Sequence, residues 1–255
     1  MNTKITDWHN QRVWIIGAST GIGAETARKL LARGARLALS ARGIEGLQSV
    51  AVDHPESLLL PFDITDHRSV IAARDKLLQC WGGIDLVLVV AGTYNKMRAV
   101  DFNIDVAEHL IDTNLRGTLN CLDAVLPTLL TQGNGGIGIV ASVAGLRGLP
   151  QALIYGPTKA ALINLCESLY LDLRPRGISV YLINPGFVAT PLTASNDFTM
   201  PALITADTAA NELLHGIEHG DFHIHFPKRF TNWLRLLRLL PYRWYFWLIH
   251  KVTGL

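Results

Sequence analysis

The chain has 255 residues, of which 49% are hydrophobic and 17% are charged, and it can bury one large core. It contains no run of 18 or more apolar residues, so we expect no membrane-spanning helix. The N-terminus is polar, so we expect no signal peptide. Cys80, Cys121 and Cys166 form neither a CxxC motif nor a Cys/His cluster. These features predict a cytoplasmic α/β protein with reduced thiols and no metal site.

The net charge of +2 is unevenly distributed along the chain. Residues 228–255 hold six Lys or Arg and no Asp or Glu, which leaves 17 basic against 21 acidic residues in 1–227. No linker rich in Pro, Gly or Ser divides the chain. We therefore predict one domain over 1–227 and a basic, aromatic extension over 228–255.

Short aliphatic runs alternate with longer segments of helical period. The runs that predict strands are 12–16, 35–40, 57–62, 84–90, 136–141, 178–183 and 222–226. Helices are predicted near 21–33, 44–51, 66–80, 104–130, 153–174 and 206–218. The first six strands are almost continuously apolar, which is typical of strands covered on both faces. This alternation predicts right-handed βαβ units and a doubly wound parallel sheet.

A glycine-rich turn follows the first predicted strand and opens the first predicted helix. Glycine allows a sharp turn and a close approach to a pyrophosphate, and a helix N-terminus offers N–H groups to an anion. The same pattern can serve as a plain tight turn, but its strand–turn–helix position predicts nucleotide binding. The residues expected at the nucleotide are Gly17, Ser19, Thr20, Gly21, Ile22 and Gly23.

Tyr155 and Lys159 lie four residues apart, so they share one face of the helix predicted over 153–174. A lysine ammonium beside a tyrosine favours the phenolate, so we expect it to lower the pKa of Tyr155 toward the working pH of an acid/base catalyst. A solvated surface pair is the alternative. Ser142 ends the fifth strand, where open parallel sheets bind their ligands, and Asn114 is a polar residue within a predicted helix.

The GxxxGxG spacing of the glycine turn, the set Asn114, Ser142, Tyr155 and Lys159, and the turn Asn184-Pro185-Gly186 together resemble the short-chain dehydrogenase/reductase family. The resemblance covers roughly residues 10–227. It departs from the family pattern at Ile16, where Thr is usual, and at Val89-Val90, where two Asn are usual. It implies a Rossmann fold and hydride transfer between a nicotinamide cofactor and a carbonyl or alcohol.

The resemblance also implies a role for individual residues. Tyr155 would donate the proton, Ser142 would hold the carbonyl oxygen, Lys159 would bind the nicotinamide ribose, and Asn114 would hold a water linked to Lys159. The remaining cofactor contacts it implies are Asp63 and Ile64 at the adenine, Ala91 and Gly92 at a ribose, and Pro185, Gly186, Val188 and Thr190 at the nicotinamide.

Ala41 and Arg42 follow the second predicted strand, where cofactor selectivity is usually decided. A 2′-hydroxyl is recognised by an acidic side chain, whereas a 2′-phosphate needs a cation and no acid. A solvated Arg opening a loop is the alternative interpretation. The absence of an acid together with the presence of a base predicts NADP(H).

Residues 191–204 are expected to form a lid over the substrate. The apolar residues expected around it are Leu146, Leu149, Leu153, Phe187, Phe198 and Met200. They favour an apolar, lipid-like substrate such as a steroid or a keto-acyl chain, although apolar lid residues also simply pack. Arg147 is the nearby charge, facing either solvent or an anionic head group.

Residues 228–255 predict an amphipathic basic helix that is interrupted at Pro241. The expected apolar face holds Phe230, Trp233, Leu234, Leu237 and Leu240, and the expected polar face holds Thr231, Asn232, Arg235 and Arg238. This segment has three possible partners: the inner face of an anionic membrane, a second subunit, or the molecule's own lid. Nucleic acid is disfavoured because the body is acidic.

The function predicted from the sequence is a carbonyl reductase that uses NADP(H). The alternative is an NADP(H)-binding regulatory or membrane-scaffolding protein with little turnover. The family resemblance further implies a homodimer or homotetramer in which the helices at 104–130 and 153–174 pair across the interface. The location expected is cytoplasmic, with peripheral contact to a membrane through 228–255 as an open possibility.

Overall fold

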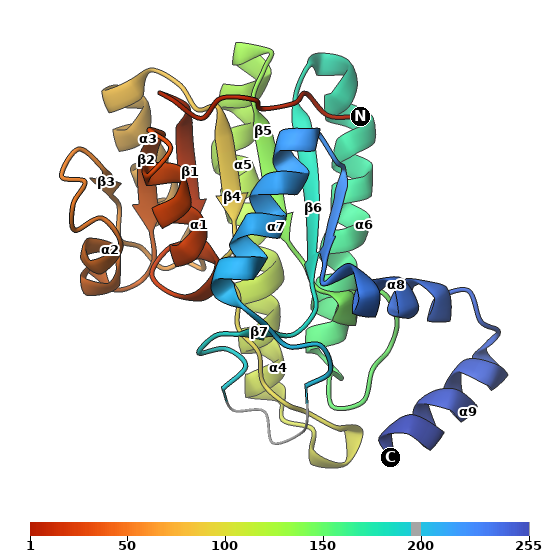
Figure 1. The fold of residues 1–255 in the computed structure, drawn as a ribbon. Helices are drawn as coiled ribbons and strands as arrows, with labels where there is room; N and C mark the ends of the chain where they lie inside the picture. The colour runs from red at the N-terminus through yellow and green to blue at the C-terminus, as the bar shows by residue number, and fades with distance from the viewer. Residues whose placement is uncertain (195–199, 255) are drawn as a thin grey trace.

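The computed structural model of the chain describes residues 1–194 and 200–254. Within them a seven-stranded parallel sheet runs in the order β3-β2-β1-β4-β5-β6-β9 (Figure 1). Its strands are β1 (Arg12–Ile16), β2 (Arg36–Ser40), β3 (Leu58–Leu59), β4 (Leu86–Val89), β5 (Gly136–Val140), β6 (Ser179–Pro185) and β9 (His223–Phe226). Because the strand order reverses between β1 and β4, the predicted doubly wound Rossmann fold is confirmed.

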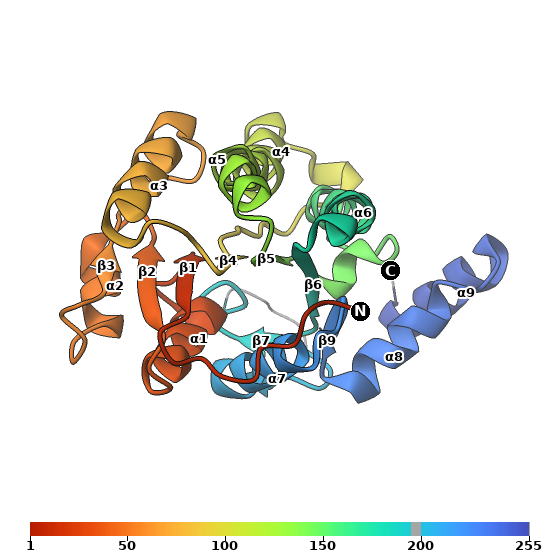
Figure 2. The same cartoon turned by 90° about the horizontal axis from the view of Figure 1, so that it is seen from above.

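Helices cover both faces of the sheet, as the view from above shows (Figure 2). One layer contains α3 (His67–Trp81), α4 (Ile104–Ile111), α5 (Gly117–Gln132) and α6 (Tyr155–Leu173). The other contains α1 (Gly21–Leu31) and α7 (Ala206–His219), with α2 (Ile44–Val50) at the edge beside β3. The extension forms α8 (Lys228–Leu237) and α9 (Tyr242–Thr253).

The strand β1 shows why the apolar runs are continuous. Successive side chains of a strand point to opposite faces. Trp14 and Ile16 pack into the core under α3, α5 and α6, whereas Val13 and Ile15 pack into the core under α1 and α7. All four are at most 1% exposed, so each of these positions favours an apolar side chain.

Two predicted elements differ from the structure. The strand predicted over 57–62 pairs as β3 only at Leu58–Leu59, because it lies at the sheet edge and has a partner on one side alone. The single helix predicted over 104–130 is divided by a π-helical turn at Asp112–Arg116. Such a turn is a single irregular turn within an otherwise α-helical span, and the apolar residues on either side do not mark where it begins. The short strands β7 (Val188–Ala189) and β8 (Ile204–Thr205) were not predicted.

The extension departs from its predicted wheel at two positions, while Phe230, Leu234, Leu237 and Leu240 of the expected apolar face are partly buried. The hydroxyl of Thr231, expected on the polar face, is buried and accepts a hydrogen bond from His225 Nδ1 at 2.6 Å while donating to the Pro227 carbonyl at 3.1 Å. Trp233, expected on the apolar face, is 69% exposed. No helix in the described part of the chain is both long and apolar enough to cross a membrane.

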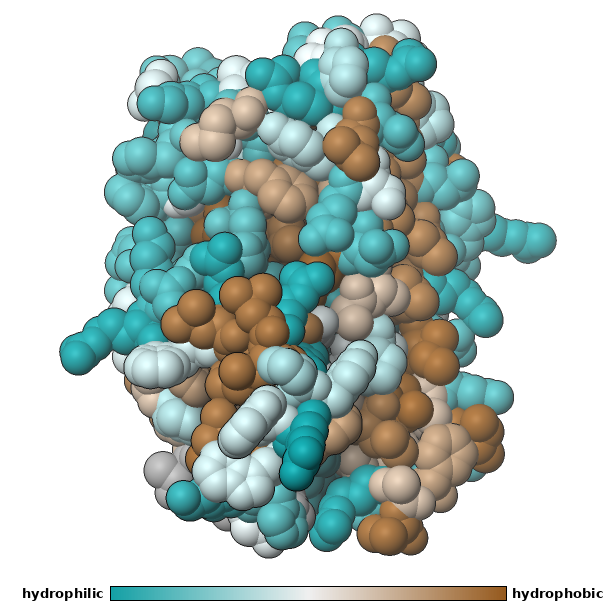
Figure 3. Space-filling view, turned by 90° about the vertical axis from the view of Figure 1, so that its right-hand side faces the viewer, coloured by the Kyte–Doolittle hydropathy of each residue, from teal (hydrophilic) through white to brown (hydrophobic). Residues whose placement is uncertain are grey.

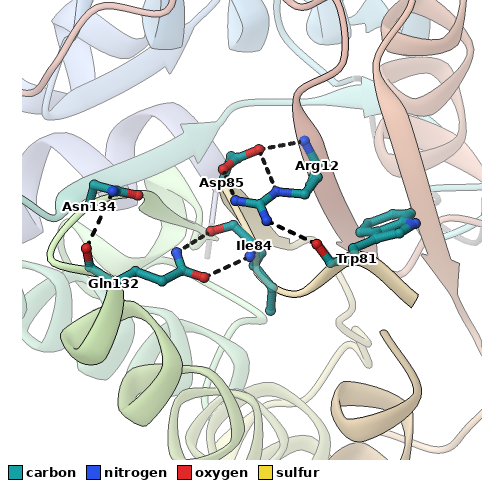
Figure 4. A network of polar contacts seen from close by, with 6 residues as sticks. All are labelled: Arg12, Trp81, Ile84, Asp85, Gln132 and Asn134. Atoms are coloured by element: carbon teal, nitrogen blue, oxygen red, sulfur yellow. Dashed lines mark hydrogen bonds and ion pairs between the residues drawn. The ribbon is translucent and has the colours of Figure 1, made fainter. Parts of the chain in front are cut away.

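A polar network joins the N-terminal ends of the central strands, opposite the end where ligands bind (Figure 4). The guanidinium of Arg12 donates to the two carboxylate oxygens of Asp85 at 3.0 and 2.6 Å and to the Trp81 carbonyl at 3.1 Å. The side chain of Gln132 bonds both the N–H and the C=O of Ile84, at 2.9 and 2.8 Å. These bonds tie β1 and β4 to the end of α5.

We expect Asp85→Asn to destabilise the fold, because it removes the charge from a partly buried, multiply bonded pair. The expected loss is about 1–3 kcal/mol, seen as a lower midpoint in denaturant and in thermal unfolding. Asp75→Asn, in the exposed pair with Arg74, is the matched control and should change stability by less than about 0.5 kcal/mol. An equal loss of unfolding free energy in the two variants would show that the network stabilises the fold no more than an exposed ion pair does.

Candidate active site

A cleft of about 780 Å³ opens where the sheet strands end at their carboxyl termini. The structure brings most of the residues singled out by sequence to its wall. Those lining it are Gly17, Ser19, Thr20, Gly21, Ile22, Arg42, Asp63, Ile64, Ala91, Gly92, Ser142, Tyr155, Lys159, Pro185, Gly186, Val188 and Thr190. Gly23 and Asn114 stand behind this wall and shape it.

The glycine turn is packed so tightly that side chains are excluded from it. A Cβ at Gly17 would lie 2.5 Å from the Ala91 nitrogen, and Gly17 has a φ of +95°. A Cβ at Gly23 would lie 2.1 Å from the Gly17 carbonyl oxygen. The first residues of α1 therefore face the cleft with their N–H groups, an arrangement that suits a pyrophosphate. The residues present fit the phosphates of a dinucleotide.

Arg42 and Asp63 also line the cleft, away from the catalytic residues expected from the sequence. Asp63 accepts hydrogen bonds from the Thr65 N–H at 2.9 Å and from the Thr65 hydroxyl at 2.7 Å. Burial acts to raise the pKa of Asp63, but these bonds and the charge of Arg42 outweigh it and hold that pKa below its ordinary value. Asp63 is therefore an anion fixed in place, and Arg42 is an exposed cation at the rim.

Tyr155 is the first residue of α6, and Ser142 lies two residues after the end of β5. Ser142 Oγ accepts a hydrogen bond from the Ala144 N–H at 3.1 Å, and its hydroxyl is also within hydrogen-bonding reach of Tyr155. Loss of surrounding water raises the pKa of Tyr155 to about 12, against the lowering effect of the Ser142 bond. Tyr155 thus keeps its proton at neutral pH.

Lys159 is buried one helical turn beyond Tyr155. Its ammonium donates to the Val140 carbonyl at 2.9 Å and lies 5.8 Å from the centre of the Tyr155 ring. Burial lowers the pKa of Lys159 to about 8. The sequence-based expectation that this ammonium lowers the Tyr155 pKa is wrong for the protein as it stands, because burial dominates both groups.

Asn114 lies in the π-helical turn and connects three segments. Its Oδ1 accepts from the Thr93 N–H at 2.8 Å, and its Nδ2 donates to the Thr93 carbonyl at 3.0 Å and to Thr158 Oγ1 at 3.2 Å. Thr158 in turn donates to the Tyr155 carbonyl at 2.8 Å. A Cβ at Gly92 would lie 3.2 Å from Asn114 Oδ1 and 3.4 Å from Lys159 Nζ, so glycine lets these groups approach.

Sequence reasoning missed three residues near the catalytic set. Thr158 sits inside the Tyr155–Lys159 motif, and its position three residues after Tyr155 was an available signal. Thr93 contributes only backbone groups and leaves no signal in the sequence. Tyr94 packs its ring edge-to-face on Tyr155, with centroids 5.0 Å apart and an interplanar angle of 83°, and only the fold brings it there.

Pro191, Leu192 and Thr193, from the segment expected to form the lid, line the cleft. Of the residues expected around the lid, Phe198 lies outside the described part of the chain. Leu146 faces the groove beneath α8 instead of the cleft. Arg147, expected to face solvent or an anionic head group, is partly exposed, and its guanidinium donates to the carbonyls of Leu237 and Leu240, both at 2.7 Å.

Among residues 1–194 and 200–254, no cluster of three or more His, Cys, Asp or Glu could hold a metal ion.

Solved structures share the fold. A short chain dehydrogenase/reductase of Burkholderia phymatum in complex with NAD superposes with a TM-score of 0.83 at 22% identity, covering 91% of this chain and 94% of that one. A short chain dehydrogenase of Burkholderia cenocepacia J2315 in complex with NADP gives 0.79 at 22% identity, with the same coverage.

Comparison at the sequence level identifies the family. The model for short chain dehydrogenases matches residues 11–200. An uncharacterized oxidoreductase of Myxococcus xanthus is 33% identical over 231 residues, which cover 89% of this chain and 91% of the relative. One from Staphylococcus haemolyticus is 31% identical over 211 residues, covering 82% and 91%. The chain therefore belongs to the short-chain dehydrogenase/reductase family of nicotinamide-dependent oxidoreductases.

Proposed function

We propose that the protein reduces a carbonyl group to an alcohol, or catalyses the reverse reaction, with NADP(H). The observation that carries this proposal is the convergence of Ser142, Tyr155 and Lys159 on the cleft that the glycine turn closes. A protein that only bound the nucleotide would have no use for two hydroxyl groups set beside each other at its catalytic end.

When bound, a nicotinamide would supply the hydride. The chain would supply the proton and the groups that stabilise the charges formed during the reaction. The hydroxyls of Ser142 and Tyr155 both donate toward a carbonyl oxygen in the cleft and stabilise the negative charge that develops on it. Tyr155 keeps its proton at neutral pH, as its raised pKa indicates, and can give it to that oxygen. The Lys159 ammonium then stabilises the phenolate that remains.

Asn114 and Thr158 are proposed to position this chemistry. Their hydrogen bonds hold the beginning of α6, and so Tyr155, against the π-helical turn. We propose that the water implied by the family resemblance is held by the Asn114 backbone carbonyl, which accepts one bond from the Thr118 hydroxyl at 2.8 Å and keeps a second lone pair.

The finer assignments are also proposals. An apolar ketone or secondary alcohol, such as a steroid or a keto-acyl chain, is supported by Leu192 on the cleft wall. A homodimer or homotetramer is supported by exposed apolar residues on α4, α5 and α6, namely Ile111, Leu119, Leu130 and Leu171. We place the protein in the cytoplasm and propose no nucleic-acid partner.

Tyr155→Phe tests the reaction. Removing the general acid should lower kcat with a panel of ketones by about 10²–10⁴-fold, followed by NADPH absorbance, and should leave the Kd for NADPH within about threefold. Tyr170→Phe, on the far part of α6 against Phe222, is the control and should keep full activity. Turnover of Tyr155→Phe within tenfold of the unmodified protein would overturn the assigned role.

Arg42→Asp tests the cofactor. It replaces the rim cation by an acid beside Ala41, so the ratio of kcat/KM for NADPH over NADH should fall by about 10–100-fold, the effect of losing one charge-assisted contact. Arg176→Asp changes an equally exposed cation outside the cleft and should leave the ratio unchanged. An unchanged ratio in Arg42→Asp would reject the assignment to NADP(H).

The pH profile tests the charge on Lys159. Its pKa is lowered to about 8, so it is a cation below that pH and loses its proton above it. We expect the reduction rate, kcat/KM, to be level between about pH 6 and 7.5 and then to fall by up to tenfold per pH unit. Lys159→Arg keeps the charge at all these pH values and should remove the fall. A fall that survives this substitution would belong to another group.

A further inference from the structure

The helices α8 and α9 present apolar side chains to solvent instead of packing them away. We call this surface the tail face. Its apolar members, each 56–79% exposed, are Trp233, Leu236, Leu239, Tyr242, Trp244, Phe246, Trp247 and Val252. The view onto this side of the molecule shows brown apolar patches alternating with teal groups in its lower half (Figure 3). A solvent-exposed aromatic surface of this extent is typical of a contact site.

The tail face is also strongly basic. Its cations, all exposed, are Lys228, Arg229, Arg235, Arg238, Arg243 and Lys251. Residues 228–255 contain no Asp or Glu. None of these six cations forms an ion pair with a carboxylate of residues 1–194 or 200–254. The positive charge is therefore available to an external anion.

We propose that the tail face binds the surface of an anionic lipid bilayer. Trp, Tyr, Lys and Arg are the residues that favour the boundary between water and lipid, and they alternate here on two short helices. At 10 and 12 residues, α8 and α9 are too short to span a bilayer and would lie in its plane. If a second copy of the chain docked on this face, its six cations would repel these six. Anionic lipid headgroups carry the opposite charge and attract them.

The tail face is fastened to the catalytic loop. Residues 143–154 connect Ser142 to Tyr155. Arg147 in this loop bonds the carbonyl of Leu237, the last residue of α8, and that of Leu240 just beyond it, and its guanidinium lies 3.9 Å from the centre of the Tyr245 ring. The Tyr245 hydroxyl donates to the Gly148 carbonyl at 2.6 Å, and Tyr245 is only 2% exposed. A bilayer bound by the helices is thus held next to the loop that carries the catalytic residues.

Exposed apolar residues continue from the tail face around this end of the molecule. Met97 pairs with Ala152 across a β-bridge, which ties the exposed Val100 and Phe102 to the catalytic loop and to the exposed Leu153. In Figure 1 the start of α4, the strand β7 and α9 all lie at the same lower end, where the sheet strands point. Given the proposed reductase function, an apolar substrate dissolved in the bilayer would reach the cleft without crossing water.

Co-sedimentation of the full chain with lipid vesicles tests the proposal. Binding is expected to vesicles of phosphatidylcholine with phosphatidylglycerol at about 0.05 M salt, and it should weaken strongly at about 0.5 M salt. Vesicles of phosphatidylcholine alone should bind weakly. Arg243→Glu with Lys251→Glu should lower the partition coefficient by at least about tenfold, on the order of fivefold per cation.

Matched variants separate this surface from general effects. The double variant Trp244→Ser with Trp247→Ser should weaken vesicle binding at both salt concentrations. The controls Lys76→Glu and Val52→Ser change exposed residues outside the extension and should not weaken it. NADPH binding by each variant shows that it is folded. Because vesicle binding needs no turnover, Tyr155→Phe should bind vesicles like the unmodified protein, so failure of the reductase proposal and failure of this one are distinguishable.

Two results would overturn the proposal. The first is an absence of salt-sensitive binding to the anionic vesicles. The second is an oligomer in solution that dissociates when Trp244 and Trp247 are replaced, since a second subunit would then cover the tail face. If binding holds, an apolar ketone supplied in anionic vesicles should show a lower apparent KM with the unmodified protein than with the tryptophan variant.

Discussion

The contact between the Gly17 turn and the backbone of Ala91 is the constraint on which the site depends. These two segments leave the ends of β1 and β4, the strands between which the sheet order reverses, and they meet where a Cβ would be 2.5 Å from a backbone nitrogen. Because they touch, the helix that follows the turn begins at the cleft and aims its N–H groups into it. The remaining walls are added by β5 and β6, whose ends carry Ser142 and Pro185-Gly186 to the same edge.

Burial decides the chemistry at that edge more than the spacing of charges does. Tyr155 and Lys159 are one helical turn apart, and spacing alone suggests that the cation draws the proton from the phenol. In the folded protein the loss of water acts on both groups and favours the neutral form of each, so Tyr155 holds its proton and Lys159 gives up its own more readily. Tyr155 is therefore a neutral phenol at neutral pH, and its proton is the one that the proposed reduction would use.

Much of the fold and of the cleft could be predicted because parallel strands leave a strong pattern. Because β1 is buried on both faces, its sequence is an unbroken apolar run that predicts a strand. The carboxyl ends of parallel strands must lie at the same edge of the sheet. Local irregularities left no such trace. The π-helical turn that holds Asn114 is a single irregular turn inside a longer helical span, and Thr93 acts only through its backbone. Tyr94 reaches Tyr155 through folding alone, and no local pattern indicates that contact.

The extension shows where a helical wheel misleads. A wheel sorts residues by polarity, but α8 packs against the body through Thr231, whose hydroxyl has partners in His225 and Pro227, and this turns Trp233 outward. The hydrogen bonds of a small polar residue thus determine which side chains remain in solvent. Arg147 then connects that exposed surface to the loop between Ser142 and Tyr155. The surface proposed to bind a bilayer and the residues proposed to carry the reaction are therefore joined through one loop.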